Sequence, residues 1–305
     1  MSRPVLVATA QMGPVPAAES RRSVVVRLVD LLREAASRRA QLVVFPEAAL
    51  TPFFPHWLVA DEAELDSYFE DSMPHAVVQP LFDEAARLGV GFYLGYAERN
   101  TEGGKVRRFN TSVLVERDGS IVGIYRKIHL PGYHQVDDSH PFQNLEKRYF
   151  DVGNLGFPVW PAFGGRVGMC ICNDRRWPET YRVMGLQGVE LVALGYNTPV
   201  HNPAMPQTDR LADFHNQLSM QSGAYQNGTW VVGTAKAGLE EGVRQIGGSC
   251  IIAPSGEIVA QATTDEDEVV TALCDLDHCK SYKENIFNLA AHRRPEHYGQ
   301  ITVPH

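Results

Sequence analysis

A cysteine that is followed at once by a charged turn is the feature of this sequence that most suggests chemistry. The run "GMCICNDRRWPE", residues 168–179, carries an apolar, strand-like segment to Cys172 and continues with Asn, Asp and two adjacent arginines. A cysteine attacks as its thiolate, so it needs a nearby base or a positive field. We therefore predict that Cys172 is a nucleophile and that the arginines hold an anionic substrate against it.

Two further predicted strands end on side chains that complement a thiol. The segment "LVVFPE" ends on Glu47 and "IVGIYRK" ends on Lys127. Because ligands gather at the carboxyl ends of the strands in predominantly parallel sheets, we expect Glu47, Lys127 and Cys172 to converge. Glu47 would accept the thiol proton, provided that burial raises the pKa of its carboxyl group. Lys127 and the backbone N–H of Asn173 would stabilise an oxyanion.

Each of these residues also has a structural interpretation. A cysteine that ends an apolar strand is usually a small buried hydrophobe, and we interpret the other four cysteines in this way: Cys170, Cys250, Cys274 and Cys279. A glutamate or lysine at a strand end is usually solvated. The functional interpretation is favoured because Glu47 follows Phe-Pro and Cys172 precedes a charged turn, two positions where packing alone explains little.

The elements that must position these residues are strands and helices that alternate in two similar halves. The first half is predicted to contain strands at 4–11, 41–47 and 90–98, helices within 20–40 and 79–89, and a hairpin at 111–127. The second half is predicted to contain strands at 165–173, 189–197, 229–235 and 267–276, helices at 178–188 and 209–226, and a hairpin at 249–263. This order predicts an α/β fold, a four-layer α-β-β-α sandwich in which two sheets pack face to face.

Composition and length indicate one globular domain. No linker or low-complexity tract separates the halves, so we predict a single domain over residues 1–280 and a C-terminal tail over 281–305. The net charge of −8 argues against a sequence-independent nucleic-acid binder, and no stretch is apolar for long enough to span a membrane. The N-terminus shows no signal peptide, and the five cysteines are irregularly spaced, so we expect a cytoplasmic protein without disulfides.

Two rival functions remain open at this point. A metal-dependent hydrolase is disfavoured because the chain has no His-Glu-x-x-His motif and no paired His/Cys spacing typical of zinc, so we expect neither a metal nor another cofactor. A catalytically inactive binding or regulatory subunit is disfavoured because Glu47, Lys127 and Cys172 are all present.

Three segments of the chain together resemble the nitrilase (carbon–nitrogen hydrolase) superfamily. The runs "VVFPEAAL", "YRKIHLPG" and "GMCICNDRRWPE" are similar to its three catalytic blocks, in the same order, and the similarity covers nearly the whole chain. Within the superfamily, "CNDRRWPE", "PFQNLEKRYF" and "GYNTPVHNP" resemble the N-carbamoyl-D-amino acid amidohydrolase (D-carbamoylase) branch. The resemblance implies a sandwich of the nitrilase type and a Glu-Lys-Cys triad of Glu47, Lys127 and Cys172.

The resemblance also implies a second carboxylate and a substrate class. Glu146 is expected to orient Lys127 or to assist proton transfer, although it is alternatively an exposed charge in a Glu-Lys-Arg run. The implied reaction cleaves the ureido C–N bond of an N-carbamoyl-D-amino acid through a covalent thioester, giving the D-amino acid, CO₂ and ammonia. An amidase or an N-carbamoyl-β-amino acid (ureido acid) hydrolase on the same scaffold is the alternative.

Two arginines after Cys172 and two residues at the end of the strand predicted at 189–197 are candidates for binding this substrate. A guanidinium matches a carboxylate in a bidentate fashion, so either Arg175 or Arg176 is expected to bind the substrate carboxylate, the other being open to a structural ion pair. Asn197 and Thr198 are expected to hydrogen-bond the ureido or carboxylate groups, or else to form an ordinary turn.

Three remaining expectations concern the periphery of the site and the assembly. His129 either lines the pocket or is a structural histidine. Asn144 stands where the D-carbamoylase branch carries a histidine, and an amide hydrogen-bonds but does not titrate near neutral pH. The resemblance implies a homodimer or homotetramer, in which the tail 281–305 is either an arm that embraces a neighbouring subunit or a disordered end.

Overall fold

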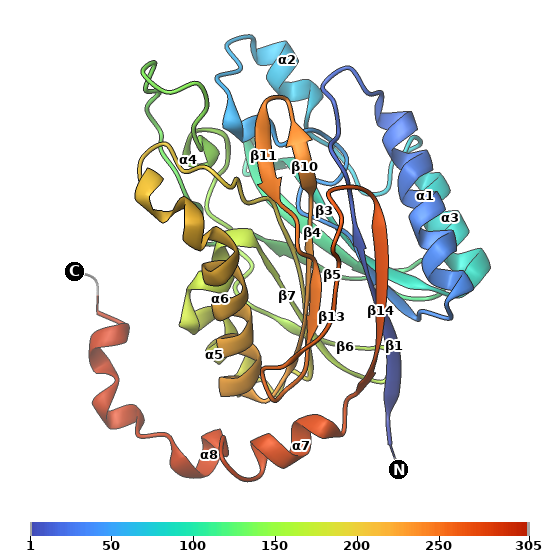
Figure 1. Cartoon of the computed structure of the whole chain (residues 1–305), viewed down its shortest axis with the longest axis vertical. Helices are drawn as coiled ribbons and strands as arrows, with labels where there is room; N and C mark the ends of the chain where they lie inside the picture. The colour runs from blue at the N-terminus through green and yellow to red at the C-terminus, as the bar shows by residue number, and fades with distance from the viewer. Residues whose placement is uncertain (1, 304–305) are drawn as a thin grey trace.

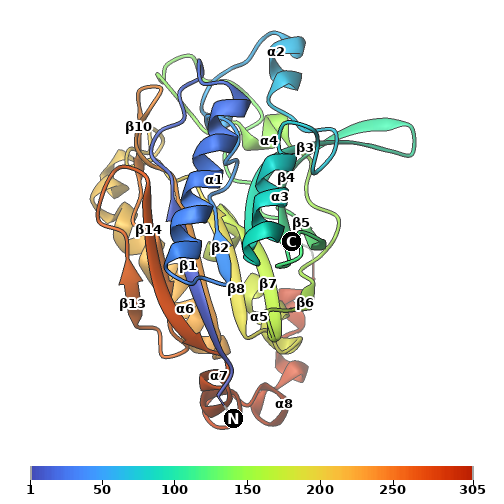
Figure 2. The same cartoon turned by 90° about the vertical axis from the view of Figure 1, so that its right-hand side faces the viewer.

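Two six-stranded sheets form the centre of the molecule, and helices cover their outer faces (Figure 1). The structure is a computed structural model that describes residues 2–303. The layers run in the order helix, sheet, sheet, helix, with α1 and α3 outside one sheet and α5 and α6 outside the other (Figures 1 and 2). The predicted four-layer α-β-β-α sandwich is therefore confirmed.

The first sheet has the strand order β14-β1-β2-β3-β4-β5. Its strands are β1 (Pro4–Gln11), β2 (Leu42–Val44), β3 (Gly91–Glu102), β4 (Lys105–Val115), β5 (Ile121–Arg126) and β14 (Glu268–Asp275). Strands β1, β2 and β3 are parallel, whereas the others pair in the antiparallel sense. The carboxyl ends of the central strands therefore lie together at one edge.

The second sheet has the order β13-β12-β9-β8-β7-β6 and repeats this plan. Its strands are β6 (Val159–Ala162), β7 (Gly165–Ile171), β8 (Leu191–Tyr196), β9 (Trp230–Ala235), β12 (Cys250–Ile252) and β13 (Ile258–Gln261). Strands β7, β8 and β9 are parallel. Apolar side chains of both sheets, among them Val7, Leu42, Met169 and Val192, form one buried cluster between them.

The helices follow the sequence signals closely. Helix α1 (Arg21–Ser37) begins after Ser20, whose side chain accepts a hydrogen bond from the Ser23 N–H, and it buries Val24, Leu28, Leu31, Leu32 and Ala35 at helical spacing. Helix α3 (Gln79–Leu88) ends at Gly89, which adopts the left-handed conformation with φ of 66°. The remaining long helices are α5 (Pro178–Leu186) and α6 (Ala212–Asn227).

Several shorter elements lie in the connections. They are α2 (Glu62–Ser67), α4 (Glu146–Tyr149), the hairpin of β10 (Ala237–Glu240) and β11 (Val243–Ile246), and the 3₁₀ turns η1 (Phe54–His56), η2 (Cys172–Arg176) and η3 (Pro206–Leu211). The sequence did not predict the β10–β11 hairpin, which stands apart from both sheets. The sequence-based prediction also placed the end of β2 at residue 47 and the end of β7 at residue 173. The strands end earlier, so Glu47 and Cys172 lie in the turns beyond them.

The C-terminal tail leaves β14 and runs along one end of the sandwich (Figure 1). It contains α7 (His278–Lys283), α8 (Leu289–His292), η4 (Pro295–His297) and η5 (Gly299–Ile301). Residues 304–305 of the predicted tail lie outside the described residues, and its role as an inter-subunit arm stays a prediction. Over residues 2–303, no helix combines the length and apolar character needed to cross a membrane, and all five cysteines are free thiols.

Candidate active site

The residues proposed for chemistry lie at the carboxyl ends of strands from both sheets. Glu47 lies three residues after β2, Lys127 directly follows β5, and Cys172 directly follows β7. Asn197 directly follows β8. The two sheets pack face to face, so turns that are far apart in the sequence meet at one edge of the sandwich, as expected for this arrangement of parallel strands.

Two glycines allow the chain around Glu47 to pass between the sheets. A Cβ atom on Gly95 of β3 would lie 2.7 Å from the Glu47 Cα, and one on Gly195 of β8 would lie 2.2 Å from the Glu47 nitrogen. Side chains at these positions would therefore collide with the backbone that carries the carboxylate. Ala48, the next residue, adopts a φ of 44°, which is a strained conformation for a residue with a Cβ.

Lys127 forms a buried ion-pair network with two carboxylates. Its Nζ lies 2.8 Å from Glu47 Oε1 and 2.5 Å from Glu146 Oε2, and all three side chains are fully buried. Asn110, on β4, donates from Nδ2 to Glu47 Oε1 at 2.7 Å and to Glu146 Oε2 at 3.4 Å. The alternative that Glu146 is an exposed surface charge is therefore wrong.

The buried network raises the pKa of Glu146 and the pKa of Lys127, for different reasons. Burial raises the pKa of Glu146 to about 7; the Lys127 charge opposes this shift, and the nearby Glu47 carboxylate adds to it. Burial disfavours the charged form of Lys127, but the Glu146 and Glu47 carboxylates outweigh that effect and raise its pKa above the ordinary value. Lys127 is therefore a fixed cation, whereas Glu146 changes its charge near neutral pH.

The raised pKa of Glu146 predicts a pH-dependent stability. From about pH 4.5 to about pH 7 the folded protein holds a proton on Glu146 that the unfolded chain releases, so the free energy of unfolding falls as the pH rises. A shift of this size corresponds to about 3 kcal/mol. Denaturant titrations at about pH 5 and about pH 8 should show this loss in the native protein and a loss smaller by about 3 kcal/mol in Glu146→Gln. An unchanged pH dependence in the variant would contradict the assignment.

Cys172 occupies a strained turn at the start of η2. Its φ is 45°, and its thiol donates to the Asn197 carbonyl oxygen at 3.4 Å. Burial and the Glu47 carboxylate raise the pKa of the thiol, so the cysteine rests as the neutral thiol and needs a base to become a nucleophile. Asn197 connects the two residues, because its backbone N–H donates to Glu47 Oε2 at 2.8 Å.

Asp174 fixes the turn around the thiol, a role that the sequence analysis missed. Its fully buried carboxylate accepts hydrogen bonds from the Ile171 N–H (3.0 Å), the Tyr125 hydroxyl (2.7 Å) and the His129 N–H (3.0 Å). These contacts tie the residue before Cys172 to the strand end that carries Lys127. The signal was present in the sequence, as the acidic member of the charged turn.

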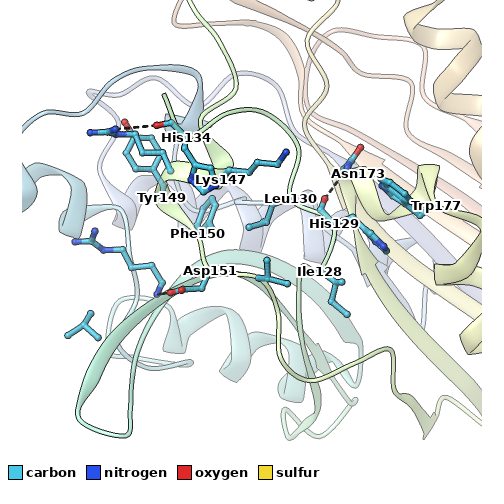
Figure 3. Close-up of a pocket in the computed structure, with 14 residues that line it drawn as sticks. Ile128, His129, Leu130, His134, Lys147, Tyr149, Phe150, Asp151, Asn173 and Trp177 are labelled. Carbon is cyan, nitrogen blue, oxygen red and sulfur yellow. Dashed lines mark hydrogen bonds between the residues drawn. The ribbon is translucent and has the colours of Figure 1, made fainter. Parts of the chain in front are cut away.

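His129 and Asn173 line a cavity of about 780 Å³ beside this turn (Figure 3). The His129 ring nitrogen Nδ1 lies 2.8 Å from Asp174 Oδ1, and the ring stacks on Trp177 at 4.8 Å between centroids. The Asn173 side chain donates to the His129 carbonyl oxygen at 3.0 Å (Figure 3). His129 thus lines a cavity and also supports the turn through Asp174, and the wall of this cavity does not include Cys172.

The two arginines have different environments. Arg175 is buried, donates from Nη1 to the Cys172 carbonyl oxygen at 2.6 Å and from Nη2 to Thr198 Oγ1 at 2.9 Å, and lies 3.6 Å from the Cys172 sulfur. Arg176 is exposed and donates to Asn173 Oδ1 at 3.2 Å. The neighbouring Arg175 charge lowers the pKa of Arg176. Within residues 2–303 neither arginine pairs with an acidic side chain, so the structural ion pair considered for one of them is wrong.

Three residues that we predicted to bind substrate make hydrogen bonds to other residues of the protein: Asn197, Thr198 and Asn144. The Asn197 side chain donates to the Glu47 carbonyl oxygen at 2.8 Å, and its Oδ1 is buried without a hydrogen-bond partner in the described part of the chain. Thr198 holds Arg175. Asn144 accepts from the Glu146 N–H at 3.0 Å and donates to Glu146 Oε1 at 3.3 Å, so it orients the second carboxylate. Over residues 2–303, no three His, Cys, Asp or Glu side chains are grouped as metal ligands.

Known proteins resemble the chain in sequence and in structure. It is 30% identical over 284 residues to N-carbamoylputrescine amidase of Arabidopsis thaliana, covering 90% of this chain and 88% of the relative. It is 28% identical over 286 residues to citrullinase of Francisella tularensis, covering 90% and 91%. The crystal structure of a carbon–nitrogen hydrolase from Helicobacter pylori matches with a TM-score of 0.83 at 22% identity, covering 99% of both chains.

The sequence model of the carbon–nitrogen hydrolase family matches residues 6–284, which include every residue of the site described above. The chain therefore belongs to the carbon–nitrogen hydrolase family, the nitrilase superfamily, and is a hydrolase that acts on carbon–nitrogen bonds.

Proposed function

We propose that the protein hydrolyses the ureido C–N bond of N-carbamoyl-D-amino acids. The observation that carries this proposal is the pair of arginines in the turn that follows the thiol. Arg175 is buried against Cys172, Arg176 follows it, and no acidic side chain within residues 2–303 pairs with either. A substrate carboxylate would pair with these arginines. Its place a few bonds from the ureido carbon fits their position three and four residues after Cys172, and Arg175 Nη1 lies 3.6 Å from the sulfur.

The reaction begins with proton transfer from the Cys172 thiol to Glu47. The thiolate then attacks the ureido carbon, and the negative charge on the ureido oxygen is stabilised by Lys127 and the Asn173 N–H. The tetrahedral intermediate collapses with loss of ammonia, which takes its proton from Glu47, and the amino acid stays attached to the sulfur through the carbonyl group. Water activated by Glu47 releases the thiol and a carbamic acid, which decomposes to CO₂ and the amino acid. Glu146 keeps Lys127 charged and in place.

The preference for a carboxylated substrate separates this chain from one class of relatives. N-carbamoylputrescine, named in the relative from Arabidopsis thaliana, carries an ammonium group at its far end, which two arginines would repel. The D configuration is supported by the resemblance of "CNDRRWPE", "PFQNLEKRYF" and "GYNTPVHNP" to the D-carbamoylase branch. An amidase or an N-carbamoyl-β-amino acid hydrolase on the same scaffold remains the second candidate, because the buried network around Lys127 suits any C–N hydrolysis.

An ammonia-release assay over a matched panel tests the proposal. The panel contains N-carbamoyl-D- and L-α-amino acids, N-carbamoyl-β-alanine, citrulline, N-carbamoylputrescine and a neutral amide. We expect the highest kcat/KM for the D-α compounds. A higher value for N-carbamoyl-β-alanine or for the amide would replace the proposal with the second candidate, and a preference for N-carbamoylputrescine would refute the role of the arginines.

Arg176 offers a direct test of carboxylate binding. Arg176→Met should raise the KM for N-carbamoyl-D-amino acids by roughly 10- to 100-fold, since it removes a charged hydrogen bond to the substrate. It should leave kcat/KM for a neutral N-alkylurea within about threefold, because that compound has no carboxylate. Arg210→Met, which removes an arginine from η3, is the matched control. Equal losses on charged and neutral substrates would contradict the role given to Arg176.

A further inference from the structure

A second fully buried ion pair lies beside the site and is not used in the proposed reaction. Lys236 directly follows β9 and Glu240 ends β10, and Lys236 Nζ lies 3.1 Å from Glu240 Oε2. Neither side chain is exposed. Removing two charges from water is costly, and a well-packed apolar pair of similar volume is often as stable. The retention of the pair at this position therefore calls for an explanation other than stability.

The contacts of the pair converge on the segment that follows Glu47. Lys236 donates from Nζ to the Thr51 carbonyl oxygen. Glu240 accepts at Oε1 from the Phe53 N–H at 2.7 Å, and at Oε2 from the Val15 N–H at 2.9 Å. The pair thus binds the backbone at Thr51 and at Phe53, and it connects this segment to Val15 in the chain that follows β1.

Glu47 depends on such anchors because no regular secondary structure holds it. The chain between β2 and η1 includes the strained Ala48. On either side of Glu47 in the sequence, the backbone is held by Gly95 of β3. The Gly95 N–H donates to the Pro46 carbonyl oxygen at 3.2 Å, and the Gly95 carbonyl oxygen accepts from the Ala49 N–H at 2.9 Å. Further along the chain, the Lys236 side chain, which follows β9 of the second sheet, holds the backbone by donating to the Thr51 carbonyl oxygen.

Lys236 also lies next to the backbone that binds the Glu47 carboxylate. Its N–H donates to the Tyr196 carbonyl oxygen at 3.3 Å, and the following residue, Asn197, donates to Glu47 Oε2. Burial lowers the pKa of Lys236, and the Glu240 and Glu47 carboxylates oppose that shift. Lys236 is therefore connected to the Glu47 carboxylate through the backbone at Tyr196 and Asn197.

We infer that the Lys236–Glu240 pair is a positioning element for the general base: it holds residues 51–53, and with them Glu47, in the geometry that allows proton transfer from Cys172. The inference rests on the role proposed above for Glu47. Lys236 and Glu240 touch no reacting atom, so they are positioning residues rather than catalytic ones.

Three variants separate positioning from simple structural support. Lys236→Met and Glu240→Gln each leave one member of the pair without its charged partner, whereas the double variant Lys236→Met/Glu240→Gln leaves a neutral, nearly isosteric pair. Lys280→Met removes the lysine of an exposed ion pair with Asp277 and is the matched control. The measurements are the thermal unfolding midpoint, kcat and KM for ammonia release, and the rate at which iodoacetamide alkylates Cys172, followed on the Cys172 peptide by mass spectrometry.

The double variant is expected to unfold at a higher temperature than either single variant, because no unpaired charge stays buried, and somewhat below the native midpoint, because the Thr51 carbonyl oxygen and one backbone N–H lose their partners. Its kcat and its Cys172 alkylation rate should nevertheless fall by about 10- to 100-fold, with KM within about threefold, because a displaced base forms less thiolate and assists less proton transfer. Lys280→Met should change none of these. Recovery of kcat and alkylation together with stability in the double variant would overturn the inference and leave the pair a structural support.

Two further outcomes keep the test decisive. If the double variant does not fold, the single variant Glu240→Gln is used instead, because its side-chain carbonyl oxygen still accepts a backbone N–H. Alkylation of Cys172 at the native rate in folded Glu240→Gln would refute the inference. Alkylation that is at least about tenfold slower would support it. If the native protein releases no ammonia from any N-carbamoyl substrate, the proposed function fails. The alkylation rates then still decide the role of the pair.

Discussion

Cys172→Ala is expected to lower kcat for ammonia release by roughly 10⁴-fold or more while substrate binding persists. In the proposed reaction the sulfur forms the covalent bond to the ureido carbon, and no other side chain in the site would replace it. In the proposed complex the substrate carboxylate binds Arg176, with the Arg175 charge nearby, and the substitution removes neither arginine. Steady-state kinetics of ammonia release, with calorimetric titration of an N-carbamoyl-D-amino acid into the variant, measures both quantities.

Cys274→Ala is the matched control for this substitution. Cys274 is also fully buried, but it lies on β14, and burial raises the pKa of its thiol without any contact to Glu47 or Lys127. We expect its kcat to stay within about threefold of the native value. Substantial turnover by a contamination-free Cys172→Ala preparation, or an equal loss in Cys274→Ala, would show that the thiol of residue 172 is not the nucleophile.

Lys127→Met should damage both stability and activity. The substitution leaves Glu47 and Glu146 buried beside each other without a cation, and removing one partner of a buried pair costs about 3–5 kcal/mol. Removal of the Lys127 charge, which lowers the pKa of Glu146, lets Glu146 take up a proton more readily than in the native protein, so part of that loss is avoided. The oxyanion loses its charged donor, so kcat should fall by at least about 10³-fold. Urea denaturation and ammonia-release kinetics at about pH 6 and about pH 8 test these expectations.

Lys280→Met is the matched control for Lys127→Met, because Lys280 is exposed. Surface ion pairs contribute about 0–1 kcal/mol, so we expect little change in its stability. A Lys127→Met protein that is folded and retains kcat within about tenfold of the native value would contradict the assignment of Lys127 to the oxyanion. A variant with native kcat and lowered stability would reduce Lys127 to a structural counter-ion of the two carboxylates.

The fold was predictable because its signals are local and repeated. Helix α1 carries a serine N-cap and a regular apolar face, α3 ends at a glycine, and the buried strands are continuous apolar runs. Some features were missed. Strand β6 and the β10–β11 hairpin have short strands with mixed burial, and β2 and β7 end before Glu47 and Cys172 although Phe45 and Cys172 prolong their apolar runs.

The site was predictable only in part. The residue types at the strand ends, together with the resemblance to the nitrilase superfamily, indicated Glu47, Lys127, Glu146 and Cys172. The supporting residues were not found, because Asn110 lies inside a strand and Asp174 follows the thiol in a turn where any acidic residue suits the surface. Their roles depend on contacts between segments far apart in the sequence, and no local pattern reports such contacts.

The arginines show a different limit of sequence-based inference. Their spacing from Cys172 indicated a carboxylate site, but it could not tell which one is buried. The structure places Arg175 under the turn, where it binds the Cys172 carbonyl oxygen and lies over the Tyr196 ring at 4.6 Å, and it leaves Arg176 exposed. Arg176 is therefore the residue that we expect to contact the carboxylate directly, with Arg175 contributing charge from beneath.

A crystal structure of Cys172→Ala with a bound N-carbamoyl-D-amino acid measures the proposed geometry itself. We predict that the ureido carbon lies over the Cβ of residue 172, with its oxygen within hydrogen-bonding distance of Lys127 Nζ and its carboxylate on Arg176. Glu47 should approach the position vacated by the sulfur. A ligand seated away from Lys127, with its ureido group held by other side chains, would show that this cluster of buried charges does not perform the hydrolysis.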